Sequence, residues 1–143
     1  MARLVGLNHI AVEVGDVDEA VAFFERFFDG VKLRGRSAGM AFVDMGDQFV
    51  ALSRGVTHVA DHGRHIGLVV DDVEDTVRRL RAGGVEVIGS HDFRDPWGNR
   101  WQLVDYREVQ FTKTDRVLEG MGLTGMEKSE RALEELRAKN LAD

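Results

Sequence analysis

The chain has 143 residues, of which 43% are hydrophobic and 31% charged, a balance typical of one globular domain and unlike that of a disordered tail. No apolar run approaches the roughly 20 residues that a membrane-spanning helix needs, and the absence of Cys excludes a disulfide framework, a thiolate nucleophile and a thiolate-bound zinc. The net charge of −6, without a Lys/Arg cluster interleaved with aromatics, argues against nucleic acid as a partner.

The N-terminal residues MARLVGLN contain no apolar stretch resembling a signal peptide. We therefore expect a cytoplasmic protein that binds neither a membrane nor a nucleic acid.

An internal repeat indicates one supersecondary unit used twice. The segment from His9 to Val21 realigns on the segment from His65 to Val77 after a shift of 56 positions, with six identities in thirteen positions. In both copies a strand pattern is followed by an Asp and then by a helix pattern. The two histidines therefore occupy the same place in each repeat.

The first copy begins with apolar residues at every second position, Ile10, Val12 and Val14, which is the period of a β-strand. The residues between them face the other way. His9 and Glu13 therefore share one face of this strand.

A helix follows the first strand. Asp16 stands where an N-cap belongs, with Glu19 three residues later as in a capping box, and the apolar residues recur at helical spacing until Gly30. Three further strands are predicted, at residues 31–37, 40–45 and 48–53.

The second copy repeats this order. A strand at residues 65–70 precedes a helix capped by Asp72 and ended by Gly83-Gly84. The only proline, in DPWG at residues 95–98, marks the turn before the last strand. The remaining predicted strands are residues 85–88, 91–94 and 99–106.

These elements predict an α+β fold in which residues 1–107 form a domain of two tandem βαβββ modules, module one at residues 4–54 and module two at 64–107. Residues 108–143 form a C-terminal helical extension, with a short helical turn at 117–121 and a helix at 129–141. This last helix packs either on its own domain or across a dimer.

The repeated histidines are the main chemical signal. A pseudo-twofold axis relates them, so their side chains approach each other if the modules pair through these strands. Neutral imidazole is the commonest metal ligand in proteins, and two imidazoles need at least one further ligand. A single His on a strand is more often a hydrogen-bonded structural residue, and that alternative applies to each of the two.

The segments LNHIAVEVGDVDEAVAFFERFF, RHIGLVVDDVEDTVRRLRAGGV and DPWGNRWQLV resemble, in this order, the vicinal oxygen chelate superfamily. The resemblance covers roughly residues 4–107. That superfamily, which includes glyoxalases, extradiol dioxygenases, fosfomycin-resistance transferases and bleomycin-sequestering proteins, curves paired βαβββ modules into a cup-like mixed sheet. The resemblance implies a small-molecule ligand, a homodimer and a divalent metal such as zinc, manganese, iron or nickel.

The resemblance also implies a ligand set. Metal ligands in the family come from the first and last strands of the modules, which maps onto His9, His65 and Gln102. Gln102 stands where the family's motif has a glutamate, and Ala51, its counterpart in module one, cannot bind a metal. Two imidazoles and an amide leave the full charge of the ion uncompensated, so we expect a weak or absent metal and a preference for an anionic, oxygen-rich ligand.

A carboxamide cannot act as a general base, so proton abstraction needs another group. Glu13, on the His9 face of its strand, is the candidate catalytic residue, although a polar side chain facing solvent is the simpler interpretation. Arg100 and Tyr106 are candidate substrate-binding residues, with an isolated surface arginine as the alternative for Arg100 and part of an aromatic pocket as the role of Tyr106. Trp101 is expected in the core.

A second metal face is conceivable between the modules. His58, His62 and His65 have helical spacing, with Asp61 nearby, and a helix there would align them. Gly55 and Gly63 flank this stretch, which favours a solvated loop.

Three functions are compatible with these patterns. The first is a glyoxalase/dioxygenase-like metalloprotein, acting as a lyase, isomerase, dioxygenase or transferase on a small oxygen-rich metabolite chelated to the metal. The second is a metal-free drug- or metabolite-binding protein of the bleomycin-resistance type, in which both histidines are hydrogen-bond donors. The third is a dimerising scaffold for the C-terminal helix.

Overall fold

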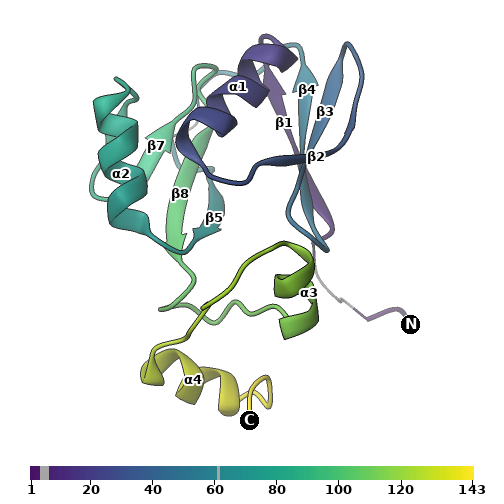
Figure 1. Ribbon diagram of the computed structural model, residues 1–143. Coiled ribbons are helices and arrows are strands. Elements are labelled where there is room, and N and C mark those ends of the chain that lie inside the picture. Colours follow the sequence, from purple (N-terminus) through teal and green to yellow (C-terminus); the bar gives the residue numbers. More distant parts are fainter. Residues whose placement is uncertain (4–6, 61) are drawn as a thin grey trace. The chain divides into compact units, whose positions relative to one another are not determined.

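A computed structural model describes residues 1–3, 7–60 and 62–143, which form two compact units, Met1–Val59 and Ala60–Asp143 (Figure 1). The first unit contains predicted module one, and the second contains module two and the C-terminal extension. The predicted start of module one, at residue 4, and Asp61 lie outside the described residues.

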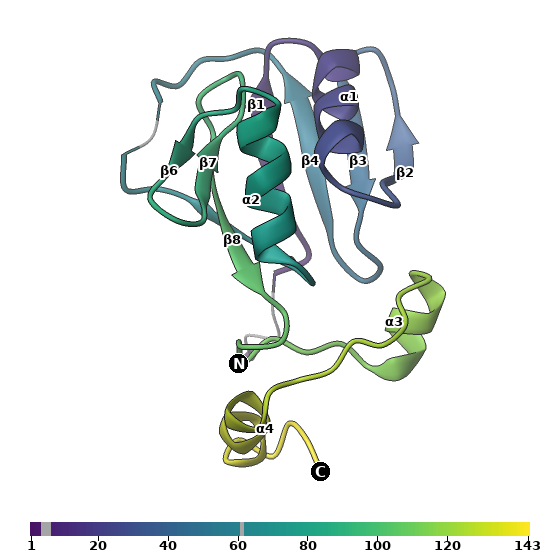
Figure 2. The same cartoon turned by 60° about the vertical axis from the view of Figure 1, so that its left-hand side comes forward.

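Module one has the predicted βαβββ order. Its four-stranded sheet has the order β1-β4-β3-β2, in which β1 is parallel to β4 and the other neighbours are antiparallel. Helix α1 covers one face of this sheet (Figure 2). The elements are β1 (His9–Val14), α1 (Val17–Phe27), β2 (Lys32–Arg36), β3 (Met40–Asp44) and β4 (Phe49–Arg54).

Helix α1 begins as predicted, because the Asp16 side chain accepts a hydrogen bond from the Glu19 amide at 2.9 Å. Val12 and Val14 of β1 are buried, and His9 and Glu13 lie on the opposite face of the strand. We call the sheet face opposite the helix the open face of each module. Phe23 and Phe27 of α1 are buried as well.

Module two repeats this plan, with the sheet order β5-β8-β7-β6 and a parallel β5-β8 pair. Asp72 caps α2 as predicted, through a 2.9 Å bond from the Asp75 amide. The elements are β5 (Ile66–Val70), α2 (Val73–Ala82), β6 (Val87–Ile88), β7 (Asp92–Arg94) and β8 (Arg100–Asp105).

All four strand predictions for module two were too long, that of β8 by one residue at each end. Strand β5 begins at Ile66, so His65 lies just before it rather than in it. Strands β6 and β7 have only two and three residues. Gly89 between them has a φ of +61°, a left-handed conformation that interrupts extended backbone and is available to glycine at little cost.

The predicted turn at residues 95–98 is organised by the buried side chain of Asp95. Its Oδ1 accepts hydrogen bonds from the backbone amides of Trp97 and Asn99, and its Oδ2 from the Asn99 amide group and from Trp101 Nε1. Trp101 is fully buried, which confirms the prediction that it belongs to the core. The Asp95 carboxylate therefore joins the turn to the core of module two.

The C-terminal extension contains α3 (Asp115–Gly120) and α4 (Glu130–Arg137). Ala132 and Leu136 of α4 are buried, and the Lys128 ammonium just before the helix donates to the backbone carbonyls of Tyr106, Val109 and Phe111. Helix α4 is thus anchored to the segment that follows β8. It ends at Arg137, four residues before the predicted end. None of the described helices has the length and apolar character that crossing a membrane requires.

Candidate functional site

His9 lies at the start of β1 with its ring exposed. Its Nδ1 is 2.9 Å from Asn8 Oδ1. An amide oxygen only accepts hydrogen bonds, so Nδ1 carries the proton in the neutral ring and Nε2 retains a lone pair. This is the tautomer that an imidazole needs to bind a metal through Nε2.

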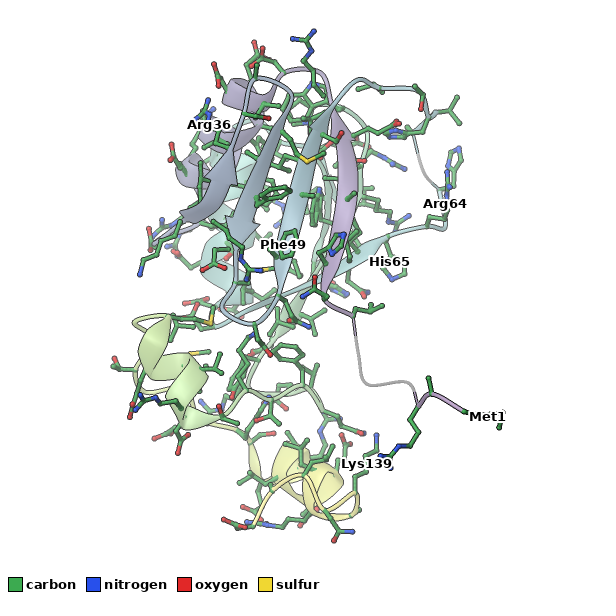
Figure 3. The ribbon with its side chains drawn as sticks, turned by 90° about the vertical axis from the view of Figure 1, so that its right-hand side faces the viewer. Met1, Arg36, Phe49, Arg64, His65 and Lys139 are labelled. Atoms are coloured by element: carbon green, nitrogen blue, oxygen red, sulfur yellow. The ribbon has the colours of Figure 1, made fainter. Side chains whose placement is uncertain are left out.

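The aromatic ring of Phe49 packs against the His9 imidazole. It is the register partner of His9 across the β1-β4 pair, and the two rings stack with centroids 4.6 Å apart and planes 11° apart. The Arg34 guanidinium lies 4.5 Å from the Phe49 centroid, and Phe42 meets Phe49 edge-on at 5.3 Å. Figure 3 shows Phe49 standing on the sheet. The sequence analysis missed this cluster, although parallel pairing of the first and last strands would have pointed to it.

His65 precedes β5 and is exposed (Figure 3). Its Nδ1 is 3.0 Å from the backbone carbonyl of Gly63. A carbonyl oxygen also only accepts, so His65 has the same tautomer as His9, with the Nε2 lone pair available. The two repeated histidines are therefore in the same hydrogen-bonding state, although different residues produce it.

The strand register relates Gln102 to Ala51. Gln102 pairs with Gly67 in module two, and Ala51 pairs with Ala11 in module one, so both stand two residues beyond the partner position of the module's histidine. Ala51 is buried and has no ligand atom. Gln102 is partly buried, and its Nε2 lies 3.5 Å from His91 Nε2, a neighbour that the sequence analysis did not identify.

Glu13 is the predicted catalytic residue, and its carboxylate is bound to the segment that follows β4. It accepts hydrogen bonds from the Thr57 hydroxyl at 2.6 Å, the Thr57 amide at 2.8 Å and His58 Nδ1 at 2.9 Å. These bonds, with the Thr57 hydroxyl first, lower the pKa of Glu13 from 4.5 to about 2. A carboxylate with so low a pKa is a weak general base at neutral pH.

The two predicted substrate-binding residues also have internal partners. Arg100 donates to Asp92 Oδ2 at 2.8 and 2.7 Å and to the backbone carbonyl of His62 at 2.6 Å. Tyr106 is buried, with its ring against Phe111 and under the Lys128 ammonium. Their predicted contact with a substrate stays a prediction.

Module two thus places His65 just before β5 and brings Arg100 and Gln102 to one face of β8, and module one brings His9 and Glu13 to one face of β1. Within the described parts of the chain, no group of three or more His, Asp or Glu side chains is arranged to hold a metal ion. The alternative helix carrying His58, His62 and His65 is absent from the described residues of that stretch, and its Asp61 lies outside them.

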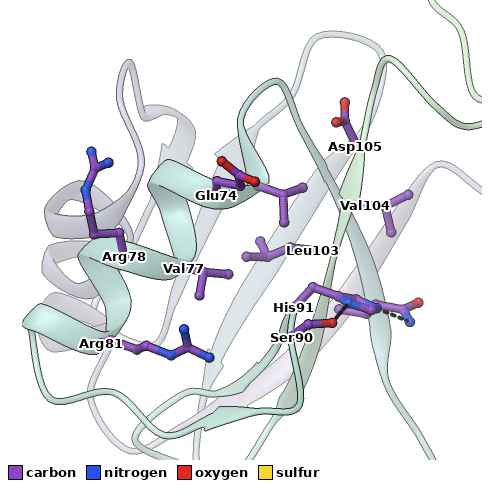
Figure 4. Close-up of a pocket in the computed structure, with 11 residues that line it drawn as sticks. Glu74, Val77, Arg78, Arg81, Ser90, His91, Leu103, Val104 and Asp105 are labelled. Atoms are coloured by element: carbon purple, nitrogen blue, oxygen red, sulfur yellow. Dashed lines mark hydrogen bonds between the residues drawn. The ribbon is translucent and has the colours of Figure 1, made fainter. Parts of the chain in front are cut away.

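A pocket of about 840 Å³ lies between α2 and β8 (Figure 4). Its volume falls in the range of roughly 300–1,000 Å³ that is usual for small-molecule sites. Val77 and Leu103 contribute apolar surface, while Arg81, Ser90 and His91 contribute polar groups. Gln102 belongs to this lining as well, so the pocket adjoins one of the predicted metal ligands.

Fold and register together define a protein of two tandem βαβββ modules, each introduced by a histidine whose Nε2 is available. The family model of the Glyoxalase/Bleomycin resistance protein/Dioxygenase superfamily matches residues 6–103. The chain belongs to this superfamily.

Solved structures show the same fold. The fosfomycin resistance protein FosX from Listeria monocytogenes, complexed with Mn(II) and sulfate, has a TM-score of 0.60 at 21% identity, covering 71% of this chain and 92% of that one. A FosX mutant complexed with Mn(II) and 1S,2S-dihydroxypropylphosphonic acid has a TM-score of 0.61 at 21% identity, covering 72% and 93%. A putative glyoxalase family protein from Bacillus anthracis has a TM-score of 0.58 at 22% identity, covering 72% and 96%.

Proposed function

We propose that this protein binds a divalent metal through His9, His65 and Gln102 and acts on a small, oxygen-rich metabolite that chelates the ion. The reaction belongs to the lyase, isomerase, dioxygenase or transferase chemistries of the superfamily. The observation that carries the proposal is the shared state of the two repeated histidines, each of which donates Nδ1–H to an oxygen and keeps the Nε2 lone pair. Oxygen acceptors on the second ring nitrogen are typical of metal-binding histidines.

The donor set favours an anionic ligand. Two neutral imidazoles and a neutral amide cancel none of the ion's charge, so a bound ligand with anionic oxygens would complete the neutralisation. The phosphonate and vicinal hydroxyls of the compound bound by the FosX mutant have this chemistry. We therefore propose a substrate class of small phosphonates, phosphates or carboxylates with a neighbouring oxygen.

A bound divalent ion would polarise the oxygens that it contacts and so lower the barrier to attack or proton loss at the neighbouring carbon. The protein would supply orientation, through the Phe49 stack on His9 and the Gly63 carbonyl on His65. The role of Glu13 as the base remains a proposal, and its hydrogen bonds to Thr57 and His58 favour instead an anchor for that segment.

The alternative function is sequestration of a drug or metabolite without metal. The Phe42-Phe49 pair on the open face of module one favours this alternative, because aromatic rings bind planar apolar ligands. In that case the histidines contact the ligand as hydrogen-bond donors. Removing both histidines would leave the contacts of the ligand with Phe42 and Phe49 in place.

Calorimetric titration with Mn²⁺ and Zn²⁺ tests the proposal on protein purified without chelator or metal-affinity resin. We expect one ion per chain, with binding strongly weakened in both His9→Ala and His65→Ala. His62→Ala is the matched control, because this exposed histidine belongs to neither repeat, and it should bind as the wild type does. Protein that takes up neither ion but still binds aromatic ligands would refute the metal site and favour sequestration.

We also propose that the chain forms a homodimer, as the family resemblance suggests. Sedimentation velocity of the full chain should then give about twice the monomer mass, and a monomer across a hundredfold concentration range would refute it.

A further inference from the structure

His91 has no place in the predicted site, yet it contacts the only residue by which the predicted ligand set departs from the family pattern. It lies just before β7, next to Asp92, which is the register partner of Gln102 in the antiparallel β7-β8 pair. Its Nδ1 is 2.6 Å from Ser90 Oγ, and its Nε2 is 3.5 Å from Gln102 Nε2 (Figure 4).

The donor and acceptor roles in this chain of contacts follow from chemistry. The nitrogen of a carboxamide only donates, so Gln102 Nε2–H donates and His91 Nε2 accepts. The proton of the neutral imidazole is then on Nδ1, which donates to the Ser90 hydroxyl oxygen. The three residues form a directed chain, from Gln102 through His91 to Ser90.

We propose that His91 is a positioning residue that fixes the Gln102 carboxamide with its nitrogen toward His91, so that its oxygen is the atom presented for metal or ligand binding. This inference rests on the proposed function in taking Gln102 as a ligand. A glutamate has two equivalent oxygens and needs no such control. A glutamine binds an ion only through Oε1, and a rotation of 180° about its last bond would present an NH₂ group instead.

The other neighbours of His91 leave Gln102 as the donor to its Nε2. Asp92 is an acidic neighbour of His91, but Arg100 binds its Oδ2. Its Oδ1 lies 3.8 Å from His91 Nε2, beyond hydrogen-bond range. Gln102 is therefore the nearer partner of Nε2. The pocket beside α2 adjoins the same ring, on the side of Ser90 and Arg81.

The hydrogen bond can be tested without any metal. Nitrogen-15 NMR distinguishes the two tautomers of a neutral histidine, and at pH 8 we expect His91 to carry its proton on Nδ1 in the metal-free protein. Gln102→Leu should remove the preference for this tautomer while the folded spectrum is retained. A proton on His91 Nε2 in the wild type would mean that Gln102 turns its oxygen toward the ring, which overturns the proposal.

Mn²⁺ affinity supplies the functional readout. Removing a residue that orients a metal ligand typically costs about 10- to 100-fold in affinity. We expect His91→Leu to weaken Mn²⁺ binding at least about tenfold, and His91→Gln, whose side-chain oxygen can accept the same bond, to restore most of it. Combined with Gln102→Glu, His91→Leu should cost less than about twofold, because a carboxylate needs no orientation.

Equal losses in the Gln102 and Gln102→Glu backgrounds, with unchanged melting temperatures, would overturn the positioning role. Failure of the proposed function gives a different pattern. If the wild type binds no Mn²⁺, the metal site is refuted, and the tautomer measurement still decides whether His91 directs the carboxamide.

Discussion

The two modules share one plan and differ in the chemistry of their open faces. Beside His9, module one has Phe49, stacked on the imidazole and contacted by Arg34. In module two, β8 begins with Arg100, which is bound to the buried carboxylate of Asp92. The position two residues further along is Ala51 in one module and Gln102 in the other. The two modules thus share a histidine and the strand order, and differ in the residues of the last strand.

The two modules therefore present different chemical groups on their open faces. Module one offers an aromatic surface and one imidazole, and module two offers an imidazole, a carboxamide and a set of buried polar contacts. A duplicated fold can therefore keep a pair of ligands through symmetry and obtain specificity from the residues that no longer match.

The largest expected effect is on the free energy of unfolding, when the buried carboxylate of Asp95 in module two is removed. Asp95→Ala removes a buried carboxylate that accepts four hydrogen bonds and leaves their donors without it. We expect it to lower the free energy of unfolding by about 4 kcal/mol. Urea denaturation measures this, with the exposed Asp71→Ala as the control, expected within about 0.5 kcal/mol of the wild type. Similar values for the two variants would show that the Asp95 turn does not hold module two together.

A second comparison concerns one ion pair in each module. Asp92 and Arg100 side chains in module two are 10% and 25% exposed, whereas Asp18 and Arg36 in module one are 79% and 42% exposed. Because water screens exposed pairs, Arg36→Ala should cost less than about 1 kcal/mol and Arg100→Ala about 2 kcal/mol or more. The same denaturation series measures both, and a larger cost for Arg36→Ala would contradict the burial argument. A loss of ligand binding in Arg100→Ala that exceeds its loss of stability would in turn support the predicted substrate contact.

The smallest expected effect concerns Glu13, whose counterpart in the second repeat is Val69. The pKa of Glu13 is lowered from 4.5 to about 2 by its hydrogen bonds, so it stabilises the folded protein above about pH 4.5 and loses this contribution as the pH falls toward 2. The melting temperatures of wild type and Glu13→Gln should therefore differ at pH 6 and converge toward pH 2. Glu25→Gln, an exposed position on α1, serves as the control. A constant difference across this range would contradict the anchoring role.

Much of the fold was predictable because its signals are local. Asp16 and Asp72 each stand directly before a helix pattern, Asp16 with Glu19 three residues later, and both cap as predicted. The alternation around Val12 and the turn at residues 95–98 were equally readable. Strands β6 and β7 were predicted but too long, because strand length there depends on the conformation of Gly89, which composition does not reveal.

The candidate site was only partly predictable, because its contacts depend on strand register. The equivalence of His9 and His65 follows from the repeat. The stack of Phe49 on His9 follows from the pairing of strands about 40 residues apart in the chain. His91 contacts Gln102 from the position next to Asp92, the register partner of Gln102. Nothing near Glu13 in the sequence points to Thr57 and His58, which reach it from beyond β4.

The most direct test of the two-histidine metal site is pulsed electron paramagnetic resonance of Mn²⁺ added to the protein, because it counts the imidazole nitrogens bound to the ion. Two coordinated imidazoles are expected in the wild type and one in His9→Ala or in His65→Ala, at Mn²⁺ concentrations high enough to compensate for weaker binding. A wild-type spectrum without imidazole coupling, or one that neither substitution changes, would contradict the proposed centre.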